Sequence, residues 1–267
     1  MITPARAWEL KKQFIDNWIA QDGLGLLNHK VQAGDRAPFP GRDLRTAGND
    51  NGILFVTYFY FVCHAHGILD EADRVRWTRA VAGLRRKNGP VGMFDRNPGR
   101  GGHDSHDNYI AIACGSILFE EPEFTREMID YGVRNGFTYD GENPGTVNFR
   151  RWRFGSSVGL YKYAADFFPD AVELIWLLGS FIWSAFMEKR NQASEGLMSW
   201  TMLEALKVLQ SRKKKKWISL SLFQLLALLW NWRMRAKTDG IGIASMFDGY
   251  FGRRSPPNPM VELAAGL

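Results

Sequence analysis

The stretch NPGRGGHDSHDNYIAIACGS, residues 97–116, concentrates side chains that can transfer protons or bind metals. His103, Asp104, His106 and Asp107 fall within five residues, directly before an apolar run. Imidazoles and carboxylates are the groups that most often act as general acids and bases. Glycines before them permit tight turns. The stretch is therefore the first candidate for a functional site in this sequence.

In a structural interpretation, the stretch only begins a helix. Asp107 or Ser105 would cap a helix that begins near Asn108, because the first N–H groups of a helix need an acceptor. The histidines would then bind backbone groups. This interpretation explains the glycines and one carboxylate, but it does not explain why two histidines and two aspartates lie so close together.

In an acid–base interpretation, Asp107 stays ionised at the positive end of the helix and acts with a second carboxylate. Asp50 takes the equivalent position before another apolar helix, so the two would share one rim if these helices are neighbours. Paired carboxylates serve glycoside hydrolysis. Lyase chemistry needs instead a base that abstracts the proton next to a uronate carboxylate, and the candidates are His103, His106 and Tyr109.

A uronate substrate also needs cations that neutralise its carboxylate. Arginines lie in the candidate stretch and in the segment FRRWRF, residues 149–154, which is compatible with an anion-binding rim or with a solvated helix face. The predicted substrate-binding residues are Arg96, Arg100, Arg150, Arg153 and Trp152.

A metal interpretation is weaker, because His103, Asp104, His106 and Asp107 have no further ligand elsewhere in the sequence that stands out. The sequence has no P-loop, dinucleotide-binding or nucleophile-elbow motif, and no recognised nucleic-acid-binding motif. We therefore expect no metal, no cofactor and no sequence-specific nucleic acid. His64 and His66 end an apolar helix, where capping or a core hydrogen bond is expected.

Helical periodicity runs through most of the chain and predicts an all-α protein. The run from Asn49 is apolar on nearly all sides, with Asp50 as a cap and Gly67 as its stop. An amphipathic helix capped by Asp70 follows, and the same pair of helices recurs about every 55–65 residues. We expect an array of αα-hairpins.

Three regions are predicted. Residues 1–48 form an N-terminal helix and an irregular arm, residues 49–237 a helical-hairpin core, and residues 238–267 an extended C-terminal tail. The apolar run at 217–232 is short for a membrane span, so we expect a buried helix, with docking to a partner as the alternative. Two cysteines inside apolar helices are expected to be buried free thiols.

The loop GMFDRNPGRGG with SHDN, and the earlier NDNG, each enter an apolar helix that alternates with amphipathic ones. This pattern resembles the (α/α) toroid families, the six-hairpin glycoside hydrolases and polysaccharide lyases, over residues 49–235. The resemblance implies a site in loops at one end of the helices. The chain has about four helix pairs, so a partial ring, or one completed by another subunit, is implied.

The arm, the Pro-rich tail and the aromatic helical body also resemble structural or accessory proteins of tailed-phage virions. Two functions stay open: an assembly protein that contacts other subunits through arm and tail, and a carbohydrate-active or glycan-binding protein with its site at 95–109. We favour the first, because the hairpins are too few for a complete toroid. The charged amphipathic start has no signal-peptide pattern, which predicts cytoplasmic synthesis, and the net charge of +6 favours acidic partners.

Overall fold

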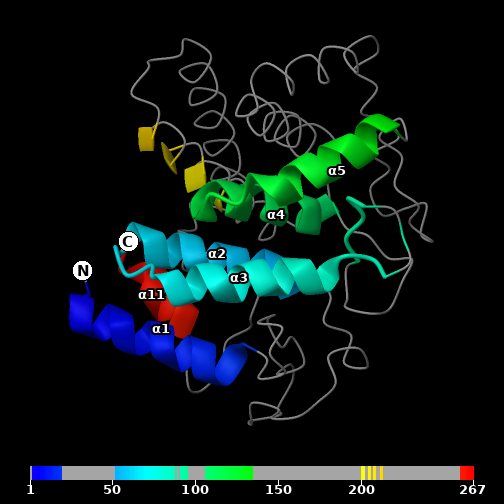
Figure 1. Cartoon of the computed structure of the whole chain (residues 1–267). Helices are drawn as coiled ribbons and strands as arrows, with labels where there is room; N and C mark the ends of the chain where they lie inside the picture. Colours follow the sequence, from blue (N-terminus) through cyan, green and yellow to red (C-terminus); the bar gives the residue numbers. More distant parts are fainter. Residues whose placement is uncertain are drawn as a thin grey trace, which may run out of the picture.

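A computed structural model describes residues 2–19, 52–87, 89, 91–95, 106–134 and 259–267, together with 200, 201, 204, 205, 207, 208, 211 and 212. These residues are mostly helical and contain no strand, and an isolated bridge joins Arg85 to Phe94 (Figure 1). The predicted helical class is confirmed for this part of the chain. The helices are α1 (Pro4–Trp18), α2 (Gly52–Ala65), α3 (Glu71–Leu84), α4 (His106–Phe119), α5 (Pro122–Arg134) and α11 (Pro259–Ala265).

Helix α2 is buried on all sides, as its apolar sequence predicts, and every residue from Gly52 to Cys63 is buried. Gly67 ends it with a φ of +67°, a conformation that favours glycine. The N–H of Gly67 donates to the His64 carbonyl at 2.9 Å, and the N–H of Ile68 donates to the Cys63 carbonyl at 3.0 Å. These two bonds make a Schellman motif, which turns the chain back into α3.

Helix α3 begins with a reciprocal capping box. The side chain of Asp70 accepts the N–H of Asp73 at 2.9 Å, and the side chain of Asp73 accepts the N–H of Asp70 at 3.0 Å. The expected stripe of Trp77, Val81 and Leu84 is fully buried. Helices α2 and α3 therefore form the predicted hairpin of one buried and one amphipathic helix.

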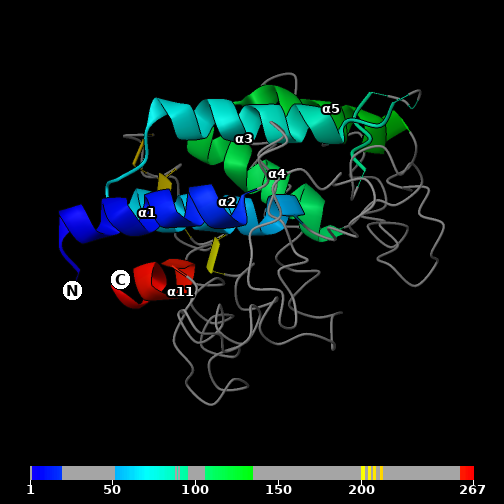
Figure 2. The same ribbon diagram turned by 90° about the horizontal axis from the view of Figure 1, so that it is seen from below.

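The second hairpin, α4–α5, repeats this arrangement. Pro122 is the first residue of α5, where its fixed φ suits a helix start. Helix α4 packs on α2, and α3 and α5 lie side by side on one face of the two buried helices (Figures 1 and 2). Two ion pairs join the outer helices. Arg74, near the start of α3, pairs with Glu121, which directly precedes α5. Arg85, which directly follows α3, pairs with Glu127 in the middle of α5 at 2.6 Å, so the two helices run in the same direction.

Trp77 holds the two hairpins together. Its indole N–H donates to the Thr57 hydroxyl of α2 at 3.0 Å. Its ring packs against Phe119 and Phe124, with centroids 5.4 and 5.8 Å away. A Cβ at Gly115 of α4 would lie 2.2 Å from the Trp77 ring, so only glycine lets the indole approach α4 this closely.

The two ends of the chain meet. Helices α1 and α11 pack on each other, on the side of α2 away from α4 (Figure 1). The Arg6 guanidinium donates to both carboxylate oxygens of Glu262, at 2.9 and 2.8 Å. The predicted N-terminal helix is confirmed, and it belongs to the hydrophobic core through Ala7, Leu10 and Phe14.

The expectation of an extended tail is wrong for its last residues, because 259–265 is helical. The Gly/Pro-rich composition of residues 238–258 is typical of extended chain, and it does not continue into residues 259–265. However, Pro259 suits a first helical position and is followed by apolar residues at helical spacing. The side chains that α11 buries are Met260, Leu263 and Ala264.

Other expectations lie outside the described residues. They include Asp50 as a cap, the irregular arm after α1, the apolar run at 217–232 and most of the third and fourth hairpins. The boundaries of the three predicted regions stay predictions.

Replacing Gly115 with alanine should destabilise the fold, because the new methyl group overlaps the buried Trp77 ring. We expect a loss of about 1–3 kcal/mol in the free energy of unfolding, the usual result of overpacking a core. Gly67→Ala is the matched control. Its Cβ meets nothing within 4 Å, so only the strain of its positive φ, about 1–2 kcal/mol, is expected. Urea unfolding measures both; a Gly115→Ala protein as stable as wild type would contradict this packing.

Candidate functional site

The structure describes few of the predicted site residues. Asp50, Arg96, Arg100, His103, Arg150, Trp152 and Arg153 lie outside the described residues. His106 and Asp107 are described by their backbone alone, at the start of α4. Tyr109 is the one predicted site residue whose side chain is described. The predicted convergence of carboxylates, histidines and arginines therefore stays a prediction.

The start of α4 differs from the expected one. The helix begins at His106, so Asp107 lies inside its first turn and is not the residue that precedes the helix. The apolar run, which begins at Tyr109, suggested a later start. Helix hydrogen bonding does not follow hydropathy, and polar residues often occupy a first turn. A negative charge at Asp107 still lies at the positive end of the helix dipole.

Tyr109 lies at the end of the candidate 95–109 segment and contacts the residue just before its start. Its side chain is buried, and its hydroxyl accepts the N–H of Phe94 at 3.1 Å. The two rings meet edge to face, with centroids 6.2 Å apart. Its predicted role as a base stays a prediction; the role that the geometry shows is to join the two ends of the 95–109 segment.

The other end of this segment is also fixed. The N–H of Asp95 donates to the Leu84 carbonyl at 2.7 Å, and the Asp95 carboxylate binds the Arg86 guanidinium at 2.7 Å. Gly92 packs so tightly on α5 that a Cβ there would lie 2.0 Å from the Glu127 carbonyl oxygen. The first residue of the 95–109 segment is thus held by a backbone hydrogen bond and an ion pair.

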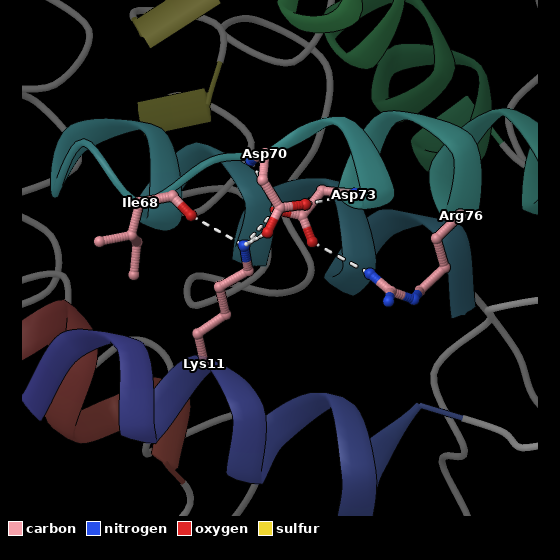
Figure 3. A network of polar contacts seen from close by, with 5 residues as sticks. All are labelled: Lys11, Ile68, Asp70, Asp73 and Arg76. Carbon is pink, nitrogen blue, oxygen red and sulfur yellow. Dashed lines mark hydrogen bonds and ion pairs between the residues drawn. The ribbon is translucent and has the colours of Figure 1, made fainter. Parts of the chain in front are cut away.

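A second group of charges, which the sequence analysis missed, joins α1 to the start of α3 (Figure 3). The Lys11 ammonium is almost fully buried, and it lies 2.7 Å from the Asp70 carboxylate and 2.5 Å from that of Asp73. It also donates to the Ile68 carbonyl at 2.8 Å. On its other side Asp73 binds Arg76 at 3.0 Å. We call these residues, Lys11, Ile68, Asp70, Asp73 and Arg76, the Lys11 cluster.

The Lys11 cluster is electrically balanced, with two cations and two carboxylates. Burial raises the pKa of Asp73, although the Lys11 ammonium opposes this rise. Burial also acts to raise the pKa of Asp70, but the hydrogen bonds from Lys11 and from the N–H of Asp73 outweigh it, and the pKa is lowered. The Trp8 ring covers the ammonium, with the Lys11 nitrogen 4.2 Å from its centroid.

This geometry gives Lys11 a structural role. A lysine nucleophile or base needs a neutral amine that a substrate can reach. Here two carboxylates and a carbonyl oxygen take the three donors of the ammonium. The signal in the sequence was a lysine inside the apolar stripe of α1, between Leu10 and Phe14.

Both cysteines are buried and free, as predicted. Burial raises the pKa of each thiol, so neither is poised as a nucleophile. The Nε2 of His66 donates to the Leu263 carbonyl at 2.7 Å, a part-buried hydrogen bond that ties α11 to the end of α2. Burial lowers the pKa of His64.

Arg212, the first residue of the basic run RKKKK, binds the end of α4. Its guanidinium donates to the Leu118 carbonyl at 2.9 Å and to the Ile117 carbonyl, and it pairs with Glu120 at 3.0 Å. A cation at a helix C-terminus satisfies its free carbonyls and its dipole. This arginine therefore has a structural role within the described residues.

The described residues hold no group of three or more metal-ligating side chains. None of their helices is both long and apolar enough for a membrane span. Comparisons with protein-family models, with curated proteins and with solved structures gave no match. The resemblance to (α/α) toroid proteins therefore rests on sequence pattern alone.

Replacing Lys11 with methionine should destabilise the protein by about 3–5 kcal/mol, because a buried carboxylate then loses its counter-ion. Asparagine at position 73 carries no charge and can still accept the N–H of Asp70. The double variant Lys11→Met/Asp73→Asn should therefore lose less than the sum of the two single losses. Urea unfolding of all four proteins measures the coupling; strictly additive losses would rule out a direct interaction.

Acid should reveal the contribution of Asp70. Because its pKa is lowered in the fold, Asp70 contributes stability above its unfolded pKa of about 4, and this contribution is lost as the pH falls through the folded pKa. Asp70→Asn should be less stable than wild type near neutral pH, and the gap should narrow below about pH 4. The raised pKa of Asp73 makes the fold more stable as the pH falls, which is the opposite of the effect of Asp70. Asp73 is present in both proteins, so its effect is shared by wild type and Asp70→Asn. Unfolding free energies across this range are the measurement, and a gap that widens in acid would contradict the assignment.

Proposed function

We propose that this chain is a structural or assembly protein, a component of a larger assembly such as a tailed-phage virion, on a partial (α/α) toroid-like scaffold. It contacts other protein subunits through the segments of the arm and tail that lie between the described helices, residues 20–48 and 238–258. The Gly- and Pro-rich composition of these segments favours extended contacts with neighbouring chains.

One observation carries the proposal. Within the described residues, the buried charged side chains are Lys11, Asp73 and Asp95, and each is in an ion pair. Lys11 and Asp73 join α1 to α3, and Asp95 with Arg86 fixes the segment that follows α3. A catalytic carboxylate or amine must instead be free to meet a substrate. Charges that hold helices together are what a scaffold needs.

The arrangement of the hairpins supports the toroid-like part of the proposal. The buried helices α2 and α4 are neighbours, and the amphipathic helices α3 and α5 cover them on one face (Figure 2). A toroid repeats such a unit around a ring. Two successive hairpins with this arrangement are compatible with a segment of one.

Sedimentation velocity of the full chain over a wide concentration range tests the assembly role. We expect species larger than a monomer that grow with concentration. Phe39→Ser removes the aromatic side chain of the arm segment AGDRAPFPGRD and should weaken association by at least about tenfold, about 1.4 kcal/mol, if that ring is buried between chains. Val91→Ser is the matched control, because Val91 is an apolar side chain with 65% exposure on the described surface.

The same preparation tests the carbohydrate-active alternative with a panel of neutral and acidic glycans. We expect wild type to cleave none of them. Asp107→Asn should keep stability within about 1 kcal/mol, the usual effect of a charge near a helix end. Glycan cleavage by wild type that Asp107→Asn abolishes, in a chain that stays monomeric at every concentration, would overturn the assembly proposal.

A further inference from the structure

Helix α1 covers one face of α2. The Phe14 ring stacks on Phe59, with centroids 4.2 Å apart and planes 28° apart. One turn away on each helix lie Lys11 and Cys63. The Cys63 thiol is fully buried; burial is the main cause of its raised pKa, and charges of the Lys11 cluster also act on it. Phe59 and Cys63 thus form a face of α2 that lies under α1.

Helix α11 belongs with α1 more than with the hairpins. Among the described helices, α1 packs chiefly on α11, and the bidentate pair of Arg6 with Glu262 joins them. Helix α11 also packs on α2 to a smaller extent, and the His66–Leu263 hydrogen bond joins it to the end of α2.

The contact between this helix pair and the hairpins includes a buried charge pair beside its apolar side chains. Docking takes the Lys11 ammonium and the Asp73 carboxylate out of water, and their mutual attraction repays only part of that loss. On undocking, the charges return to water. An interface of this kind opens more readily than an apolar one of the same size, and such regions undergo local unfolding below the global transition.

We propose that α1 and α11 form a two-helix strap that undocks from α2 as one unit, while the hairpins α2–α3 and α4–α5 stay folded. The Lys11 cluster sets how often the strap opens. Opening uncovers the Phe59 and Cys63 face of α2. This inference goes beyond the assembly role and does not depend on it, since the strap belongs to the single chain.

The two cysteines of the chain are natural reporters of this motion. Cys63 lies under the strap, whereas Cys114 lies in α4, on the other side of α2 from the strap (Figure 1). Reaction of the native full chain with a maleimide, followed by mass spectrometry, gives the labelling rate of each thiol. We expect wild-type Cys63 to react faster than Cys114.

Lys11→Met should speed the labelling of Cys63 on the order of a hundredfold, because the variant removes the counter-ion of a buried carboxylate. Cys63 should still react faster than Cys114, since exposure of Cys114 requires the hairpins to unfold. Arg86→Met is the matched control. It breaks the buried pair with Asp95, which lies outside the strap, and should not speed Cys63 selectively. Hydrogen exchange should rise together over residues 4–18 and 259–265 in Lys11→Met.

Equal labelling rates for the two thiols in wild type and in Lys11→Met would overturn the proposal, because they would indicate opening by global unfolding only. Faster exchange in α1 without α11 would also overturn it. If Lys11→Met does not fold, Asp70→Asn replaces it, since Asp70 is partly exposed and its loss leaves the Lys11–Asp73 pair in place. That variant should raise Cys63 labelling several-fold, with Cys63 again the faster of the two thiols.

Discussion

Helix α2 has no side that can face water, and the described fold follows from that constraint. Its residues from Gly52 to Cys63 are all buried, so other elements must cover it from every direction. Helix α3 covers one side through Trp77, α4 another through Phe119, and α1 a third through Phe14. A chain that buries one helix so completely must wrap several others around it, and it brings both of its ends into the same core.

Ion pairs join the helices at the edges of this core, whereas apolar packing joins them inside it. The pairs of Arg74 with Glu121 and of Arg85 with Glu127 align the outer helices, and they are exposed enough to contribute little each. The Lys11 cluster differs because its ammonium and the Asp73 carboxylate are buried. The cluster determines where α1 packs on the start of α3. It adds little to the stability of that packing, because the cost of desolvating the charges offsets much of their attraction. The Lys11 cluster thus sets the position of α1 on the start of α3.

A scaffold role fits this use of charge. Asp95 and Tyr109, which border the segment first suspected of catalysis, hold its two ends through Arg86 and Phe94. Such anchoring would serve a functional loop as well as a structural one. The comparisons with known proteins gave no family from which chemistry could be carried over, so the assembly role rests on how the described side chains are used.

Local features of the fold could be predicted from the sequence because their causes are local. Gly67 ends α2 since glycine takes its positive φ easily, and Pro122 begins α5 with a φ already fixed. Asp70 caps α3 because its side chain accepts the N–H of Asp73, three residues further on. The buried character of α2 and of both cysteines follows from composition alone. The tertiary structure decided what depends on distant partners. Lys11 became a buried ion only because Asp70 and Asp73, about sixty residues away in sequence, meet it in space. The last seven-residue helix became stable because α1 offers it an apolar face, and isolated helices of that length do not form in water.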